Sequence, residues 1–230
     1  KDFSTPVRPA NPIPYVNQKG VIERDFTPKE SYYVFQSYWT KKPMLHIYGH
    51  SWPVRWGNDG DEKEILVYSN CSKVELFVNG ESQGIHQRDS QEFPAARWNV
   101  KLKNGLNTLR AVTVDTKESL TDELTFEYQT EKWGKATAFQ VKATPLKSGV
   151  IKVEAQLVDD KGIRCLDSRE FIYFDIAGDG KLIQNQGTVT GSRKIQARNG
   201  RAQILVQTHQ GTSCVAVKAN NVQTSFITVK

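Results

Sequence analysis

Hydrophobic and polar residues follow two different periods along the chain. Between residues 27 and 42 the large apolar side chains recur at helical spacing, and from residue 44 onward they alternate in short runs that are typical of strands. Residues 1–16 show neither period and contain four prolines, which impose extended or turn geometry. The pattern predicts an irregular N-terminal loop, one helix and a long series of strands.

The helix is expected to begin at Thr27. Thr27 is a suitable N-cap, Pro28 suits the first helical position, and Glu30 would complete a capping box. One stripe of the helix carries Tyr32, Phe35, Gln36 and Trp39, with Tyr33 beside it. Because nothing else in the chain reads as helical, we expect the natural partner of this stripe in a segment preceding residue 1. Otherwise the stripe is expected to pack on the first sandwich, over which the N-terminal loop would drape, or on another copy of the chain.

Two groups of strand-like runs follow the helix. The first group lies between residues 44 and 130 and is punctuated by turn signals at 58–60, 79–80 and 104–105; the second lies between 138 and 230. Asn-Gly pairs such as Asn79-Gly80 favour hairpins, because a type I′ turn needs positive φ at both positions. The first group predicts a β-sandwich of about seven strands, and the second predicts another sandwich.

The predicted fold class is therefore mainly β: two tandem immunoglobulin-like sandwiches preceded by a loop and a helix. The expected boundaries are 1–42 for the loop and helix, 43–130 for the first sandwich and 131–230 for the second. The two sandwiches share no repeat at the level of residues, so they share an architecture only.

Composition and charge exclude several classes of function. A 38% apolar content is enough for real cores, and no run reaches the roughly 18 apolar residues that cross a bilayer. The net charge of +6 is spread among acidic residues without a basic block, so we expect no nucleic-acid partner. The three cysteines are far apart and form neither a disulfide framework nor a CxxC pattern. The chain opens on Lys1 without a signal-peptide pattern, as a cut edge would.

No catalytic constellation emerges from the residue pattern. The acidic residues fall in turns or on exposed strand positions, so no carboxylate pair is indicated of the kind that retaining glycosidases hold about 5 Å apart. Nucleophile elbows of the GxSxG type and phosphate-binding glycine loops are absent from the sequence. We therefore expect no catalytic residue and no cofactor within these 230 residues.

His46 and His50 have the i, i+4 spacing of a helical metal site. Their segment reads as a strand running into a loop, where positions i and i+4 are expected to lie far apart. The sequence therefore predicts no metal site.

Two other groups of residues are candidates for sugar contacts. Trp52 and Trp56 lie in a loop bounded by proline and glycine, where they would either pack between the sandwich and the helix or stack on sugar rings. Asn17 and Lys19, two residues apart in an extended segment, point to the same side and together would hold a carboxylate or sugar hydroxyls. A plain surface turn before a helix is the alternative at this point.

Several stretches resemble a known enzyme family. Residues 17–21, with the Tyr32-Tyr33 and Gln36-Ser37 pairs and Trp39 downstream, resemble the last strand–loop–helix unit of the catalytic (β/α)8 barrel of glycoside hydrolase family 2, the β-galactosidases and β-glucuronidases. Residues 43–48, 67–71 and 74–80 are similar to the Ig-like domain that follows the barrel. Residues 131–230, with segments 158–162 and 178–182, resemble a further bacterial Ig-like domain.

The resemblance implies the C-terminal part of a retaining glycosidase whose two catalytic glutamates lie upstream. This chain alone would then be inactive, its partners being the barrel, a carbohydrate substrate and other copies in a homo-oligomer. Such enzymes are periplasmic or secreted. The Asn-x-Lys motif with which β-glucuronidases bind the uronate carboxylate falls on Asn17 and Lys19, yet galactosidases have similar sequences here, so both activities stay open. A stand-alone carbohydrate-binding or structural Ig-like module is the alternative from another class.

Overall fold

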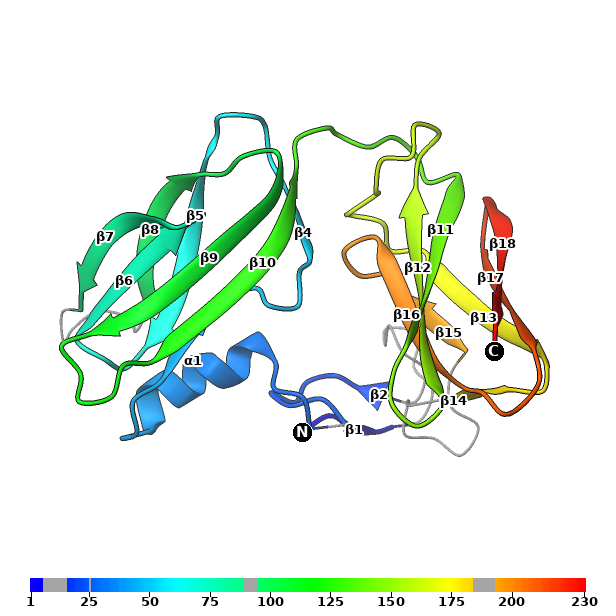
Figure 1. The fold of residues 1–230 in the computed structure, drawn as a ribbon, viewed down its shortest axis with the longest axis horizontal. Helices are drawn as coiled ribbons and strands as arrows, with labels where there is room; N and C mark the ends of the chain where they lie inside the picture. The colour runs from blue at the N-terminus through cyan, green and yellow to red at the C-terminus, as the bar shows by residue number, and fades with distance from the viewer. Residues whose placement is uncertain (6–15, 25, 89–94, 184–192) are drawn as a thin grey trace. The chain divides into compact units, whose positions relative to one another are not determined.

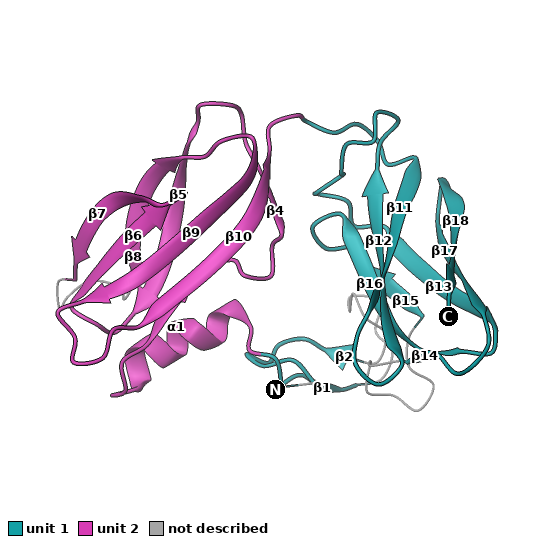
Figure 2. Cartoon of the chain, in the orientation of Figure 1, with its two compact units in different colours: residues 1–27, 132–230 teal, residues 28–131 magenta. Residues whose placement is uncertain are grey.

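The structure is a computed structural model that describes residues 1–5, 16–24, 26–88, 95–183 and 193–230. Across these ranges the chain forms many strands and one helix (Figure 1), so the predicted mainly β fold is confirmed. It divides into two compact units (Figure 2): residues 28–131 form one, and residues 1–27 with 132–230 form the other. No helix within the described ranges is long and apolar enough to cross a bilayer.

Residues 28–131 contain a sandwich of two sheets. One sheet has five strands in the order β4-β10-β9-β6-β7, and the other has three in the order β3-β5-β8. All neighbours are antiparallel except β4 and β10, which run parallel. The strands are β3 Leu45–Ile47, β4 Val54–Trp56, β5 Glu62–Ser69, β6 Lys73–Val78, β7 Glu81–Gln87, β8 Ala95–Lys101, β9 Gly105–Val114 and β10 Thr121–Gln129.

The core of this sandwich follows from strand alternation. On β5, Ile65 and Val67 point inward and are almost fully buried, and Leu109 and Phe126 meet them from the other sheet in the same cluster. The predicted hairpin at Asn79-Gly80 is confirmed, with φ of 52° and 90° joining β6 to β7. The turn signal at 104–105 instead carries the chain from β8 to β9, which belong to different sheets.

The buried side chain of Asn107 links two turns of this sandwich by hydrogen bonds. Its buried amide donates to the carbonyls of Lys103 and Gly105 and accepts from the Lys103 N–H and the Asn79 side chain, over 2.7–3.1 Å. Asn107→Ala is expected to lower the free energy of unfolding by about 2–3 kcal/mol, because four hydrogen bonds of one buried side chain are lost at once. Urea denaturation measures this, with exposed Asn58→Ala as the matched control; equal midpoints for both variants would contradict it.

The second sandwich, in residues 132–230, also has two sheets. Their orders are β11-β12-β16-β14 and β15-β13-β17-β18, all antiparallel. The strands are β11 Ala138–Pro145, β12 Val150–Val158, β13 Phe171–Gly178, β14 Lys181–Ile183, β15 Lys194–Gln196, β16 Arg201–Gln207, β17 Ser213–Ala219 and β18 Val222–Val229. Each corresponds to a run expected from the sequence. The core contains the nearly inaccessible Val153, Phe174 and Val217.

The N-terminal segment contributes one short pair of strands. β1 (Phe3–Ser4) pairs antiparallel with β2 (Val16–Asn17), and Phe3 lies opposite Asn17. The four prolines of the predicted loop fall within 6–15, outside the described residues, so its path over the first sandwich stays a prediction.

The helix, α1, runs from Glu30 to Trp39 and therefore starts later than predicted. Lys29 occupies the N-cap position without a side-chain cap, so the capping box of Thr27 and Glu30 does not form. The reason lies in the Glu30 carboxylate, which accepts hydrogen bonds from the Gly49 N–H and the His46 ring instead. Tertiary contacts thus outweigh the local capping signal.

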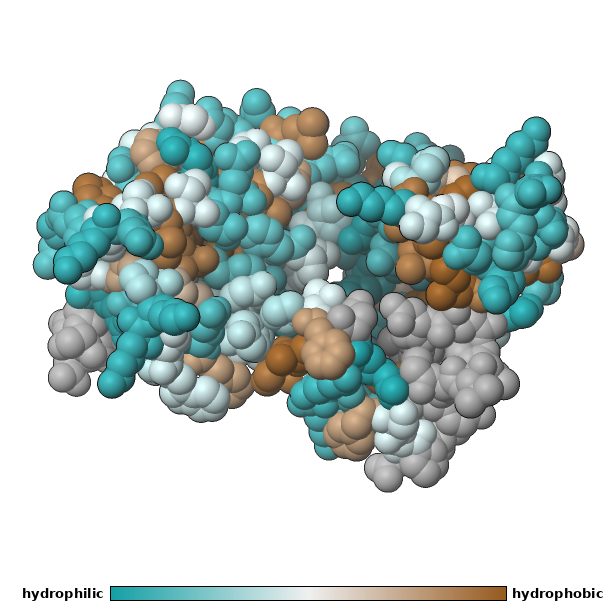
Figure 3. Space-filling model, turned by 60° about the horizontal axis from the view of Figure 1, so that its bottom comes forward, coloured by the Kyte–Doolittle hydropathy of each residue, from teal (hydrophilic) through white to brown (hydrophobic). Residues whose placement is uncertain are grey.

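The prediction that the aromatic stripe of α1 packs on the first sandwich is wrong. The face that does so carries Tyr33, Val34 and the buried Ser37, and it covers a small outer cluster of the β3-β5-β8 sheet formed by Met44, Tyr68 and Ala95. Phe35 and Trp39 stack on each other and stay 41% and 77% exposed. The surface view shows apolar residues reaching solvent in separate patches among polar ones (Figure 3).

Candidate functional site

Asn17, the last residue of β2, and Lys19 form a tight turn. The Lys19 backbone N–H donates to Asn17 Oδ1 over 3.0 Å, and the next N–H, of Gly20, donates to Asp2 Oδ1 over 2.9 Å. A side chain at Gly20 would meet the backbone of Lys1 at 2.3 Å, so only glycine fits here. Lys1 and Asp2, which precede β1, thus hold the turn in place and leave the Lys19 side chain exposed.

Trp52 and Trp56 belong to the other compact unit. Trp56 lies on β4, not in a loop as predicted, and Trp52 lies in the turn before it. They are 39% and 38% exposed, and Trp52 meets Tyr48 edge-to-face at 5.6 Å. Their role as packing residues or as a sugar platform stays a prediction.

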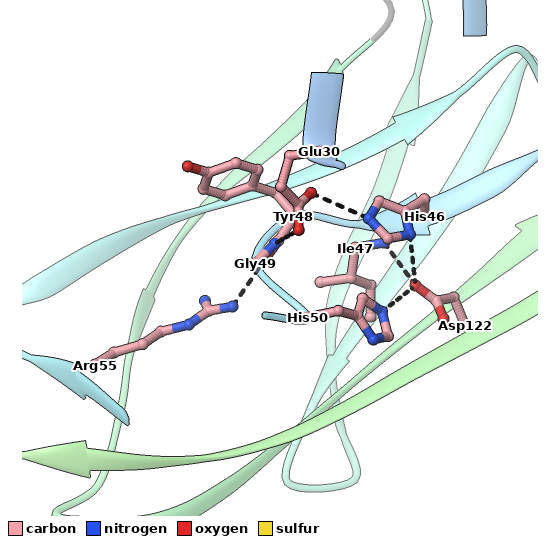
Figure 4. A network of polar contacts seen from close by, with 8 residues as sticks. All are labelled: Glu30, His46, Ile47, Tyr48, Gly49, His50, Arg55 and Asp122. Atoms are coloured by element: carbon pink, nitrogen blue, oxygen red, sulfur yellow. Dashed lines mark hydrogen bonds and ion pairs between the residues drawn. The ribbon is translucent and has the colours of Figure 1, made fainter. Parts of the chain in front are cut away.

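A polar network that no sequence pattern indicated joins α1 to the sandwich (Figure 4). His46, from β3, is buried between two carboxylates: its Nε2 lies 3.1 Å from Glu30 Oε2, and its Nδ1 lies 4.0 Å from Asp122 Oδ2. Asp122, from β10, also accepts from the Ile47 N–H over 2.7 Å and lies 2.8 Å from His50 Nε2. One helix, one strand of each sheet and one loop therefore meet at these side chains.

The expectation that His46 and His50 lie far apart is wrong. Their rings stack with centroids 4.9 Å apart, because β3 ends at Ile47 and the chain turns back through Gly49, whose φ is 96°. A side chain on Gly49 would also meet Arg55 Nη2 at 2.6 Å. On the other side, the Tyr33 ring lies parallel to His46 with centroids 3.5 Å apart.

The charges of the network shift its pKa values. The hydrogen bond to Asp122 raises the pKa of His50 above its usual value. Burial alone would raise the pKa of Asp122, but the bonds from His50 and Ile47 outweigh it and lower that pKa. Burial lowers the pKa of the Arg55 guanidinium, which donates to the Tyr48 carbonyl over 2.9 Å. The network therefore favours an ionised Asp122 beside a readily protonated His50.

A family model described as a domain of unknown function, DUF4982, matches residues 60–119 of the first sandwich. Among curated proteins, a putative β-glucuronidase of Formosa agariphila is 46% identical over 90% of this chain and 26% of its own length. A β-galactosidase of Bacteroides ovatus, BoGH2A, is 30% identical over 82% of this chain and 22% of its own length.

Solved structures match the whole chain. The β-glucuronidase of Parabacteroides merdae is 59% identical and superposes over 100% of the chain with a TM-score of 0.93. The chain is a homologue of glycoside hydrolase family 2 enzymes. The chain also matches β-glucuronidase 3 of Bacteroides uniformis, at 55% identity and a TM-score of 0.93. It spans only 29–30% of these two solved chains, where it corresponds to the C-terminal region, so the recognition made from the sequence is confirmed.

Proposed function

We propose that the chain is the non-catalytic C-terminal part of a retaining β-glycosidase that cleaves terminal β-glucuronides. The observation that carries the proposal is the 59% identity over the whole chain to a protein named a β-glucuronidase. The chain spans about a quarter to a third of such relatives, so catalysis belongs to the remainder of the protein. The isolated chain is expected to be inactive.

Within this proposal, Asn17 and Lys19 bind the uronate carboxylate. The turn occupies Asn17 Oδ1 with the Lys19 backbone N–H, so the site presents the Asn17 amide N–H groups and the Lys19 ammonium. Both are donors, and a carboxylate offers only acceptors. A charge-assisted hydrogen bond of this kind contributes about 1.5–3 kcal/mol. The anchored turn therefore supports a preference for an acidic sugar over a neutral one.

Lys19→Ala in the whole protein tests this role. We expect turnover of an aryl β-glucuronide, as kcat/KM, to fall by about ten- to a hundredfold, because the carboxylate loses its charged partner. Turnover of an aryl β-galactoside should change little. Lys147→Ala, at another exposed lysine, is the matched control. Equal loss on both substrates would show that Lys19 does not bind the carboxylate.

A β-galactosidase is the second candidate, favoured by the relative from Bacteroides ovatus that carries this name. The unmodified whole protein distinguishes the two. Higher kcat/KM on the aryl β-galactoside than on the aryl β-glucuronide would favour the galactosidase.

The two sandwiches and α1 are proposed to support the catalytic barrel. The outward face of α1, with Phe35, Tyr38 and Trp39, is the surface we assign to the barrel contact, because three large aromatic side chains are exposed on one short helix. Assembly of several copies into a homo-oligomer remains part of the proposal. Neither role requires a catalytic residue in this chain.

A further inference from the structure

We propose that His46, His50 and Asp122 bind a divalent transition-metal ion of the zinc class. One ligand atom from each of the three residues lies within 4.8 Å of the others. All three belong to the compact unit 28–131, and the site is independent of the sugar-binding role assigned to Asn17 and Lys19.

The distances suit a small ion with short bonds. Zinc binds imidazole nitrogen and carboxylate oxygen at about 2.0–2.2 Å in a tetrahedron, which separates neighbouring ligand atoms by roughly 3.3 Å. The separations from Asp122 Oδ2 are 2.8 Å to His50 Nε2 and 4.0 Å to His46 Nδ1, one below this value and one above it. His50, whose side chain is 36% exposed, has room to adjust its ring. Modest rotations therefore bring the three ligands into place.

Glu30 prepares His46 for this role. Its Oε2 lies 3.1 Å from His46 Nε2, and its other oxygen is held by the Gly49 N–H at 3.0 Å. A proton on Nε2 that points at Glu30 leaves the lone pair of Nδ1 facing Asp122 Oδ2. Metal-binding histidines commonly donate their second N–H to a carboxylate in this way, which fixes the tautomer and the ring. The buried imidazole thus has its non-coordinating nitrogen occupied and its coordinating nitrogen available.

Charge and ligand type select the ion. Glu30 and Asp122 supply two negative charges, and Arg55 nearby supplies one positive charge, so the surroundings are anionic when both histidines are neutral. Two nitrogen ligands disfavour calcium and magnesium, which prefer all-oxygen sites. The Ile47 N–H holds Asp122 in position (Figure 4). The His50 side chain is 36% exposed, which gives an ion and a fourth, water ligand access from solvent.

The alternative to a metal ion between His46 Nδ1 and Asp122 Oδ2 is a proton on His46. A doubly protonated His46 would also satisfy Glu30 on one side and Asp122 on the other, without any metal. The two cases differ in what the chain binds, so metal titration separates them.

The experiment is titration of the chelator-treated whole chain with Zn²⁺ by calorimetry, and with Co²⁺ by visible absorption. A Cys214→Ser background removes the exposed thiol as a competing ligand. We expect one ion per chain, and a higher unfolding temperature with Zn²⁺ but not with Ca²⁺ or Mg²⁺. His50→Ala should weaken binding by at least about tenfold, and Glu30→Gln by about ten- to a hundredfold.

His209→Ala, at an exposed histidine of the second sandwich, is the matched control and should leave binding unchanged. Equal binding by His50→Ala and His209→Ala would overturn the proposal. So would the absence of zinc binding together with nitrogen NMR shifts that show both His46 nitrogens protonated.

Discussion

Trp39→Ala is expected to destabilise the whole protein by about 3–5 kcal/mol and the isolated chain by less than about 0.5 kcal/mol. In the chain, Trp39 is 77% exposed and stacks only on Phe35 among the aromatic rings described. If the barrel covers this face in the whole protein, the same substitution removes a buried indole and leaves a cavity. Denaturation of both proteins in urea, with and without the substitution, measures the difference.

The test depends on comparing the loss of stability that Trp39→Ala causes in the whole protein with the loss that it causes in the isolated chain. Phe226→Ala, at an exposed phenylalanine on β18 and outside the helix, is the control and should be nearly neutral in both. A small effect of Trp39→Ala in the whole protein would show that Trp39 stays exposed there and that the barrel does not cover this face of α1.

Phe174→Ala should lower the free energy of unfolding of the second sandwich by about 3–5 kcal/mol. Phe174 is 1% exposed on β13 and belongs to the core between the two sheets, so its removal costs both transfer energy and a cavity. Phe226 on β18 is 66% exposed, and Phe226→Ala should cost less than about 0.5 kcal/mol. Thermal and urea unfolding measure both variants.

This pair changes the same side chain in the same sandwich, so burial is the main difference between them. Comparable losses of stability would mean that the face of β18 around Phe226 is covered, as it would be in an oligomer. A loss at Phe174 below about 1 kcal/mol would contradict the core described above.

Strands that bury one face were readable from the sequence because alternation and turn residues are local properties. Each of the eight strands of the second sandwich overlaps an expected run, and Asn79-Gly80 adopts the positive φ values that its hairpin needs. Two strands of the first sandwich escaped prediction. β4 has only three residues, and β7 is a largely exposed, polar edge strand, so neither shows a hydrophobic period.

The packed face of α1 was misjudged for a related reason. The most apolar stripe of the helix faces outward, and the sandwich contacts a face whose small Ser37 bonds the Val34 carbonyl and whose Tyr33 stacks on His46. Side-chain size and ring stacking decide this contact, and neither appears in a hydrophobic pattern.

The His46, His50 and Asp122 cluster depends on contacts that no local pattern contains. Gly49 turns the chain so that the two histidines meet, and Asp122 arrives from a strand 75 residues beyond Ile47. The Asn17–Lys19 pair, in contrast, is a candidate from its spacing in an extended segment, although spacing alone favours a surface turn there. Only the family resemblance points to the uronate carboxylate as its ligand.

Glu30 is the first residue of α1, and its carboxylate also accepts hydrogen bonds from His46 and Gly49 of the sandwich. This link bears on how such enzymes exchange domains. A sandwich cut at the expected boundary, residue 43, would lose the acceptor of the Gly49 N–H and expose the His46 ring that Tyr33 covers. The piece that can move between proteins and still fold is therefore residues 28–131, helix included. Recombination among homologous enzymes should therefore preserve this helix together with the sandwich that follows it.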